Sequence, residues 1–121
     1  MGDTISANGI SAKVVEKINK DDSAQGLPAF SNTSDLYFGK GKKSGEIIQL
    51  RLYKNRKAYM DFDWGHPHGD FPTGKVHVHF YEFDATGKLQ KIKGKDRLMN
   101  NAEIKKYGPL IKKANPKAKF R

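Results

Sequence analysis

The chain has 121 residues, which is room for one domain, and its net charge is +10, from 23 Lys and Arg against 13 Asp and Glu. Because it contains no cysteine, disulfides, thiolate zinc sites and cysteine nucleophiles are excluded. It has no apolar run that could span a bilayer and no signal-peptide core after its first residue. A basic field of this strength attracts polyanions, and nucleic acid is the commonest of them.

The first third of the chain is predicted to contain little regular structure. Residues 1–8 are small and polar and are expected to be a tail. Ser11 is a candidate cap for a short helix that continues to about Lys20. Residues 23–34 have an irregular pattern. Residues 1–35 are therefore predicted to be a tail, a short helix and a loop.

Alternating apolar and polar residues predict a sheet in the remainder, residues 36–121. The expected elements, in chain order, are a short strand or apolar plug at 36–38, a basic loop at 39–45, strands at 48–53, 58–63 and 76–81, a fourth strand near Leu89, and a short basic helix from Asn101 to Tyr107 that ends at Gly108-Pro109. Short turns join the strands. The prediction is a small α+β domain, with a twisted antiparallel sheet and short flanking helices.

The second face of these strands carries reactive side chains. If the strands pair in order, one surface holds Arg51, Tyr59, Asp61, Asp63, His77, His79 and Tyr81, and the loop between the second and third strands adds His66, His68 and Asp70. All four histidines of the protein lie between His66 and His79. Their grouping beside acids in a basic chain favours a functional site over four separate structural histidines.

This cluster is suited to the cleavage of RNA. RNA carries its own nucleophile, the 2′-hydroxyl, next to the scissile phosphate. Cleavage needs a base for that proton, an acid for the departing 5′-oxygen, and cations for the charge on the transition state. Histidine serves as acid or base near neutral pH, and lysine or arginine supplies the charge. The scheme requires no metal and no other cofactor.

A metal site is the competing interpretation of the same residues. His77 and His79 alternate on one face of a strand, so both imidazoles can bind one ion. His66 or His68 together with Asp63 or Asp70 would complete a tetrahedron. Such a site could hold zinc for structure or for hydrolysis.

Short motifs in this region resemble a known family. Asp63-x-x-His66-x-x-x-Asp70, then His79-x-x-x-Phe83-Asp84 with Thr86-Gly87, and later Ile104-Lys105-Lys106-Tyr107 resemble the nuclease domain of ribosome-cutting colicins. The wider stretch from residue 49 to residue 79 is similar to the C-terminal toxin domains of bacterial polymorphic toxins, including contact-dependent inhibition and Rhs-type systems. The resemblance covers residues 46–107. It implies a barnase- or colicin-ribonuclease-like fold and metal-independent RNA cleavage.

The resemblance also implies roles for individual residues. Asp63 would orient or charge-stabilise a histidine, His66 would be the general acid or share the acid–base work, and His79 would contact the phosphate. Asp70 lies where the family has its general-base glutamate; His68 or His79 could take that role. The family's late arginine falls at Ala102, which leaves Arg97, Arg51 or a nearby lysine to hold the phosphate. The residues expected to bind the substrate are Arg51, Tyr59, His68, His77, Tyr81 and Arg97.

The sequence therefore predicts an endoribonuclease toxin that cuts ribosomal or transfer RNA. The resemblance implies that a producing bacterium secretes or delivers it, that it acts in the cytoplasm of a target cell, and that a cognate immunity protein inhibits it. The basic surface predicts that this immunity protein is acidic. A membrane is not expected as a partner, because no basic amphipathic helix in the sequence carries a large apolar face. Two alternatives remain: an RNA-binding module without catalysis, and a metal-dependent nuclease that uses the histidine cluster.

Overall fold

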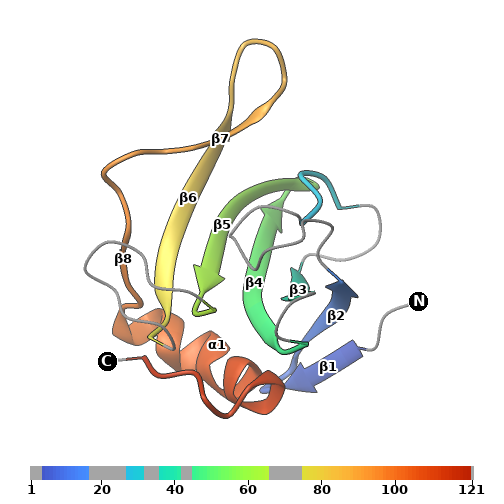
Figure 1. Cartoon of the computed structure of the whole chain (residues 1–121), viewed down its shortest axis with the longest axis vertical. Helices are drawn as coiled ribbons and strands as arrows, with labels where there is room; N and C mark the ends of the chain where they lie inside the picture. The colour runs from blue at the N-terminus through green and yellow to red at the C-terminus, as the bar shows by residue number, and fades with distance from the viewer. Residues whose placement is uncertain (1–3, 17–26, 32–35, 42–44, 66–74, 121) are drawn as a thin grey trace.

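The computed structural model describes residues 4–16, 27–31, 36–41, 45–65 and 75–120 (Figure 1). Its elements are β1 (Thr4–Ala7), β2 (Ile10–Glu16), β3 (Leu36–Lys40), β4 (Ile47–Lys54), β5 (Lys57–Asp63), β6 (His77–Phe83), β7 (Leu89–Lys91), β8 (Arg97–Leu98) and helix α1 (Asn101–Ala114). The strands form one sheet in the order β1-β2-β3-β4-β5-β6-β7, and β8 also pairs with β6. In this part of the chain, no helix has both the length and the hydropathy to cross a membrane.

The expected α+β class is confirmed, with two differences in detail. The sheet is mixed, because β2 and β3 run parallel while the other neighbours are antiparallel. The described residues contain a single helix of 14 residues instead of several short ones. The strands predicted at 36–38, 48–53, 58–63, 76–81 and near Leu89 are confirmed as β3, β4, β5, β6 and β7.

The N-terminal prediction was wrong. Residues 4–16, expected to be a tail and the start of a helix, form the hairpin of β1 and β2. Asn8 and Gly9 make its two-residue turn with φ angles of 56° and 77°, which is the geometry that an Asn-Gly pair favours between strands. The β-branched residues of β2 pair with β1 on one side and β3 on the other, so pairing outweighs the weak helical periodicity.

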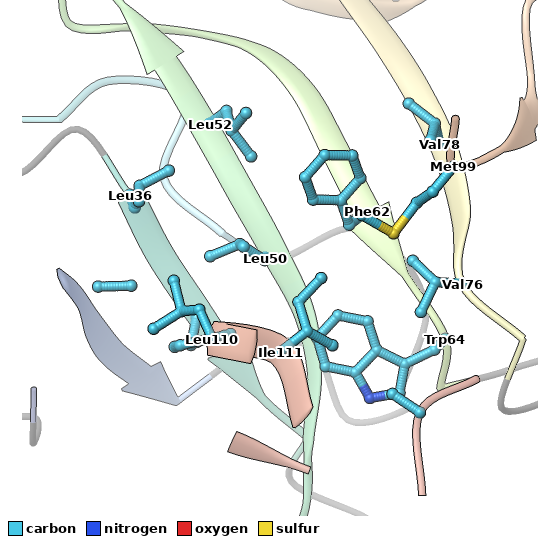
Figure 2. Packing of buried hydrophobic residues seen from close by; sticks show 13 residues of the cluster. Leu36, Leu50, Leu52, Phe62, Trp64, Val76, Val78, Met99, Leu110 and Ile111 are labelled. Carbon is cyan, nitrogen blue, oxygen red and sulfur yellow. The ribbon is translucent and has the colours of Figure 1, made fainter. Parts of the chain in front are cut away.

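The hydrophobic core lies between one face of the sheet and α1 (Figure 2). Leu50, Phe62 and Val78, from three adjacent strands, are fully buried together with Leu110 and Ile111 of α1. Because side chains alternate along a strand, the apolar residues of β4, β5 and β6 face the helix and the polar residues between them face away from it.

Helix α1 is longer than predicted. It begins after Asn100, whose side-chain oxygen accepts from the Glu103 N–H at 2.9 Å while the Glu103 carboxylate accepts from the Asn100 N–H at 2.9 Å. It then continues through Gly108-Pro109 to Ala114 instead of ending there. Pro109 has no N–H for the carbonyl of Lys105, and Asn8 donates its side-chain amide to that carbonyl at 3.3 Å. A tertiary contact thus replaces the missing helical bond.

Candidate active site

The three central strands bring polar side chains into two rows on the face of the sheet that points away from α1. The register gives, from β4 through β5 to β6, the rows Gln49–Asp63–His77 and Arg51–Asp61–His79. Each of these side chains is at most 3% exposed. The predicted grouping of Arg51, Asp61, Asp63, His77 and His79 is therefore confirmed, and the group is buried.

A buried ion pair occupies one part of this face. Arg51 Nε donates to Asp61 Oδ1 at 2.6 Å and Arg51 Nη2 donates to Asp61 Oδ2 at 2.8 Å, while Gln49 Nε2 donates to the same Oδ2 at 2.6 Å. Arg51 Nη1 donates to the Leu27 carbonyl at 3.0 Å. Burial opposes the charge of Arg51, but the Asp61 carboxylate outweighs it and raises the Arg51 pKa. Arg51 therefore stabilises the sheet through its two hydrogen bonds to the Asp61 carboxylate.

The histidine cluster lies beside this ion pair. His79 Nε2 is 3.9 Å from Asp63 Oδ2, and the rings of His77 and His79 meet edge to face with centroids 4.8 Å apart. His79 Nδ1 lies 3.0 Å from Asp96 Oδ1, and the Lys91 ammonium is 3.2 Å from the other oxygen of Asp96. The imidazole of His79 is thus held between two carboxylates.

These contacts favour one tautomer of each histidine. His77 Nδ1 lies 3.2 Å from the Lys75 carbonyl, and a carbonyl can only accept, so Nδ1 carries the proton. The Asp96 carboxylate, 3.0 Å from His79 Nδ1, favours the proton on that nitrogen. Burial lowers the pKa of His79, although Asp96 acts in the opposite direction. The lowered pKa favours the neutral ring of His79 at pH 7, and its Nε2 lies 3.9 Å from Asp63 Oδ2.

The donor set of the cluster is one that a metal ion could use. Asp63, His77 and His79 each offer a ligand atom, and these atoms lie within 4.8 Å of one another. Tetrahedral zinc with ligand bonds of about 2.0–2.1 Å places its ligands roughly 3.3 Å apart. The most widely separated of these atoms would have to approach one another by about 1.5 Å to hold such an ion. His77 Nδ1 is hydrogen bonded to the Lys75 carbonyl, and an acceptor on the outer ring nitrogen is the usual arrangement of zinc-binding histidines.

Tyr81 lies on the same face, as predicted, and Tyr59 does not. The guanidinium carbon of Arg51 lies 4.8 Å from the centre of the Tyr81 ring, and burial raises the Tyr81 pKa. The pairing of β4 and β5 jumps from Leu52–Met60 to Tyr53–Ala58, which leaves Tyr59 as the extra residue of a β-bulge. The bulge turns Tyr59 toward the helix side, where it packs with the main core. The alternation placed it on the wrong face.

Arg97 also lies away from the histidines. Its guanidinium is bidentate to the Glu103 carboxylate, at 2.7 and 2.9 Å, and lies 5.3 Å from the centre of the Phe80 ring. Arg97 pairs with Val78 across β6 and β8, so its side chain takes the helix side. The structure therefore does not bring Arg97 to the predicted phosphate site.

Three further residues were predicted for the site, and two residues of the cluster were not predicted. His66, His68 and Asp70 lie outside the described residues. Asp96 and Gln49 belong to the cluster but were not predicted from the sequence. Gln49 alternates with Arg51, so the strand pattern could have identified it. Asp96 lies between β7 and β8, where no periodicity marks it.

No protein-family model, no curated protein and no solved structure matches this chain.

Proposed function

We propose that the chain is an endoribonuclease that cleaves RNA without a metal, by attack of the 2′-oxygen on the adjacent phosphorus. The 5′-oxygen leaves, so the products end in a 2′,3′-cyclic phosphate and a 5′-hydroxyl. The protein then supplies a base, an acid and positive charge. The proposal rests on the cluster of Asp63, His79 and Asp96 in a chain of net charge +10.

His79 suits the role of general base. Its lowered pKa keeps the ring neutral, and Asp96 holds the proton on Nδ1, so Nε2 can accept the 2′-hydroxyl proton. Asp63, 3.9 Å from Nε2, would stabilise the imidazolium that forms. The family resemblance supplies the rest: His66 as general acid and Asp70 as a further acid–base group. Because Asp63 and His79 are buried, a phosphate reaches His79 only in a more open conformation.

The colicin and polymorphic-toxin resemblance extends this proposal to a biological setting. The toxin would have a barnase- or colicin-ribonuclease-like fold, would be secreted or delivered by one bacterium, and would cut ribosomal or transfer RNA in the cytoplasm of another. A producing cell would need an immunity protein. Since a surface that binds phosphates also attracts carboxylates, that inhibitor would be acidic and its association would weaken with salt.

The test is to incubate the full chain with total RNA in the presence of a chelator. We expect cleavage by the wild type, and a loss of about 10²–10⁴ in rate for His79→Gln and Asp63→Asn. Glu82→Gln is the control, because Glu82 is an exposed acid on the same strand as His79. Circular dichroism and RNA affinity check that each variant is folded. Cleavage by folded His79→Gln at the wild-type rate would contradict the proposal.

Metal-dependent hydrolysis is the second candidate, favoured by the donor atoms of Asp63, His77 and His79 within 4.8 Å of one another. Two imidazoles and one carboxylate would hold the ion, and zinc would supply an activated water at the remaining position. The same assay separates the two candidates: activity lost in chelator and restored by zinc supports this one. RNA binding with no cleavage under any condition would support a non-catalytic RNA-binding module.

A further inference from the structure

Phe30 stands out on the surface of the molecule. Among the described residues it is the one large hydrophobic residue that is exposed, with an exposed fraction of 53%. Its ring lies against Phe83 at the end of β6, with centroids 5.1 Å apart and planes 35° from each other. The Lys57 ammonium lies 5.7 Å from the centre of the Phe83 ring. Two aromatic rings and a cation thus form one exposed patch.

The backbone holds Phe30 in this position. Ala29 and Ser31 are hydrogen bonded to the start of β5 and the turn before it, through Ala58 N–H to the Ala29 carbonyl at 2.9 Å and Ser31 N–H to the Arg56 carbonyl at 2.9 Å. Tyr53 Oη donates to the Pro28 carbonyl at 2.6 Å. A segment fixed at both sides of Phe30 presents its ring at little further entropic cost on binding.

The patch shares a face with the candidate active site. Side chains alternate along β6, so His77, His79, Tyr81 and Phe83 point the same way. Phe83 is four residues beyond His79, or about 13 Å along the strand. In Figure 1, β6 runs from α1 out to the hairpin with β7, which places Phe83 at the outer end of this row.

Exposed cations lie in the chain segment next to the patch. Lys54, Arg56 and Lys57, in and around the turn between β4 and β5, are all exposed. Phosphate groups on either side of a nucleotide could therefore meet positive charge while its base lies on the rings. Proteins that bind single-stranded nucleic acid combine these two features, a basic groove and aromatic side chains on which bases stack.

We propose that Phe30 and Phe83 form a stacking site for an unpaired RNA base, and that Lys57 and Arg56 bind the adjoining phosphates. The inference rests on the proposed function and names its substrate class: RNA that is single-stranded a short distance from the cleaved bond. A duplex cannot use the site, because its bases are already stacked.

The test measures the affinity of the full chain for a 2′-O-methyl oligonucleotide, which has no free 2′-hydroxyl and so is not cleaved. Phe30→Leu, which keeps an apolar side chain without a flat ring, should weaken binding about tenfold, in line with roughly 1–3 kcal/mol for each stacked base. Phe30→Tyr should bind as the wild type does. Neither variant should change affinity for a duplex of the same sequence.

A matched pair of charge variants completes the test. Lys57→Ala should weaken single-strand binding more than Lys105→Ala, which removes the same charge from an exposed site on α1. Equal affinity of Phe30→Leu and wild type, with RNA still cleaved, would overturn the stacking site alone. A wild type that neither cleaves nor binds RNA would instead overturn the proposed function. Loss of a co-purifying protein on Phe30→Leu, with RNA affinity unchanged, would show a protein interface and also overturn the inference.

Discussion

His79 and Asp96 meet at 3.0 Å, from Nδ1 to Oδ1, although Asp96 lies in the irregular segment between β7 and β8, which no strand pattern predicts. The contact sets the tautomer of the proposed base, and burial of His79 lowers its pKa. Asp96 is therefore a positioning residue for His79. The charge state of this pair gives the first prediction.

Stability should fall as the pH drops from about 7.5 to about 5, through the ordinary histidine pKa near 6.5. Below that pKa the unfolded chain takes up a proton on His79 while the folded chain resists it, so the free energy of unfolding decreases. The stability is fully present above the unfolded pKa and is lost as the pH falls toward the folded one. His79→Gln should have a smaller pH dependence in urea denaturation, and an identical slope would contradict the burial of a neutral ring.

The ion pair of Arg51 and Asp61 should be essential to the fold. Arg51→Ala leaves the buried Asp61 carboxylate without its cationic partner, and should reduce the free energy of unfolding by about 3–5 kcal/mol. Lys54→Ala, at an exposed site on the same strand, should change it by less than about 0.5 kcal/mol. Replacement of both partners, Arg51→Met with Asp61→Leu, should recover much of the loss. Equal effects of Arg51→Ala and Lys54→Ala would exclude this role.

Asn8 should stabilise α1 at Pro109. Its amide donates to the carbonyls of Lys105 and Lys106, each at 3.3 Å, and its φ is 56°. Asn8→Gly keeps that backbone conformation and removes the donor, so it should cost about 1 kcal/mol. Asn8→Ala should cost about 1 kcal/mol more, because alanine is strained at positive φ. Thermal denaturation of the wild type and the two variants measures this order of stability. Asn8→Ala as stable as the wild type would contradict the prediction.

RNA binding should depend steeply on salt. Each neutralised phosphate releases counterions, so the logarithm of the affinity should fall linearly with the logarithm of the salt concentration, by about 0.7 for each contact with a single strand. Titration of the 2′-O-methyl oligonucleotide at several salt concentrations gives this slope. Lys57→Ala should lower it by about one contact. An affinity independent of salt would indicate a neutral ligand instead of RNA.

Simple alternation predicted the centre of the sheet well. The alternation correctly placed four residues on one face, because β4, β5 and β6 are long strands with one face in the core. These residues are Arg51, Asp63, His77 and His79. The predicted face of Tyr59 was wrong because a bulge adds a residue to β5, and a one-residue shift moves a side chain to the other face of the sheet. A bulge depends on the pairing of two strands and leaves no mark in either one alone.

The ends of the chain were harder to predict, for different reasons. The Asn8-Gly9 turn is a recognised hairpin pattern, so β1 could have been found from the sequence. The continuation of α1 through Gly108-Pro109 could not have been found from the sequence, because it depends on contacts with Asn8 and with the Phe120 ring. A Cβ on Gly108 would lie 3.3 Å from that ring, so glycine allows the close approach.

The most direct test of the proposed chemistry is the identity of the new RNA ends. We predict that the wild-type chain, in the presence of a chelator, produces a 2′,3′-cyclic phosphate and a 5′-hydroxyl, and that a 2′-O-methyl group at the cleaved nucleotide blocks the reaction. His79→Gln should form both ends about 10²–10⁴-fold more slowly. Ends carrying a 5′-phosphate, formed only when a metal is supplied, would show that water and not the 2′-oxygen attacks, and would contradict the acid–base role of His79.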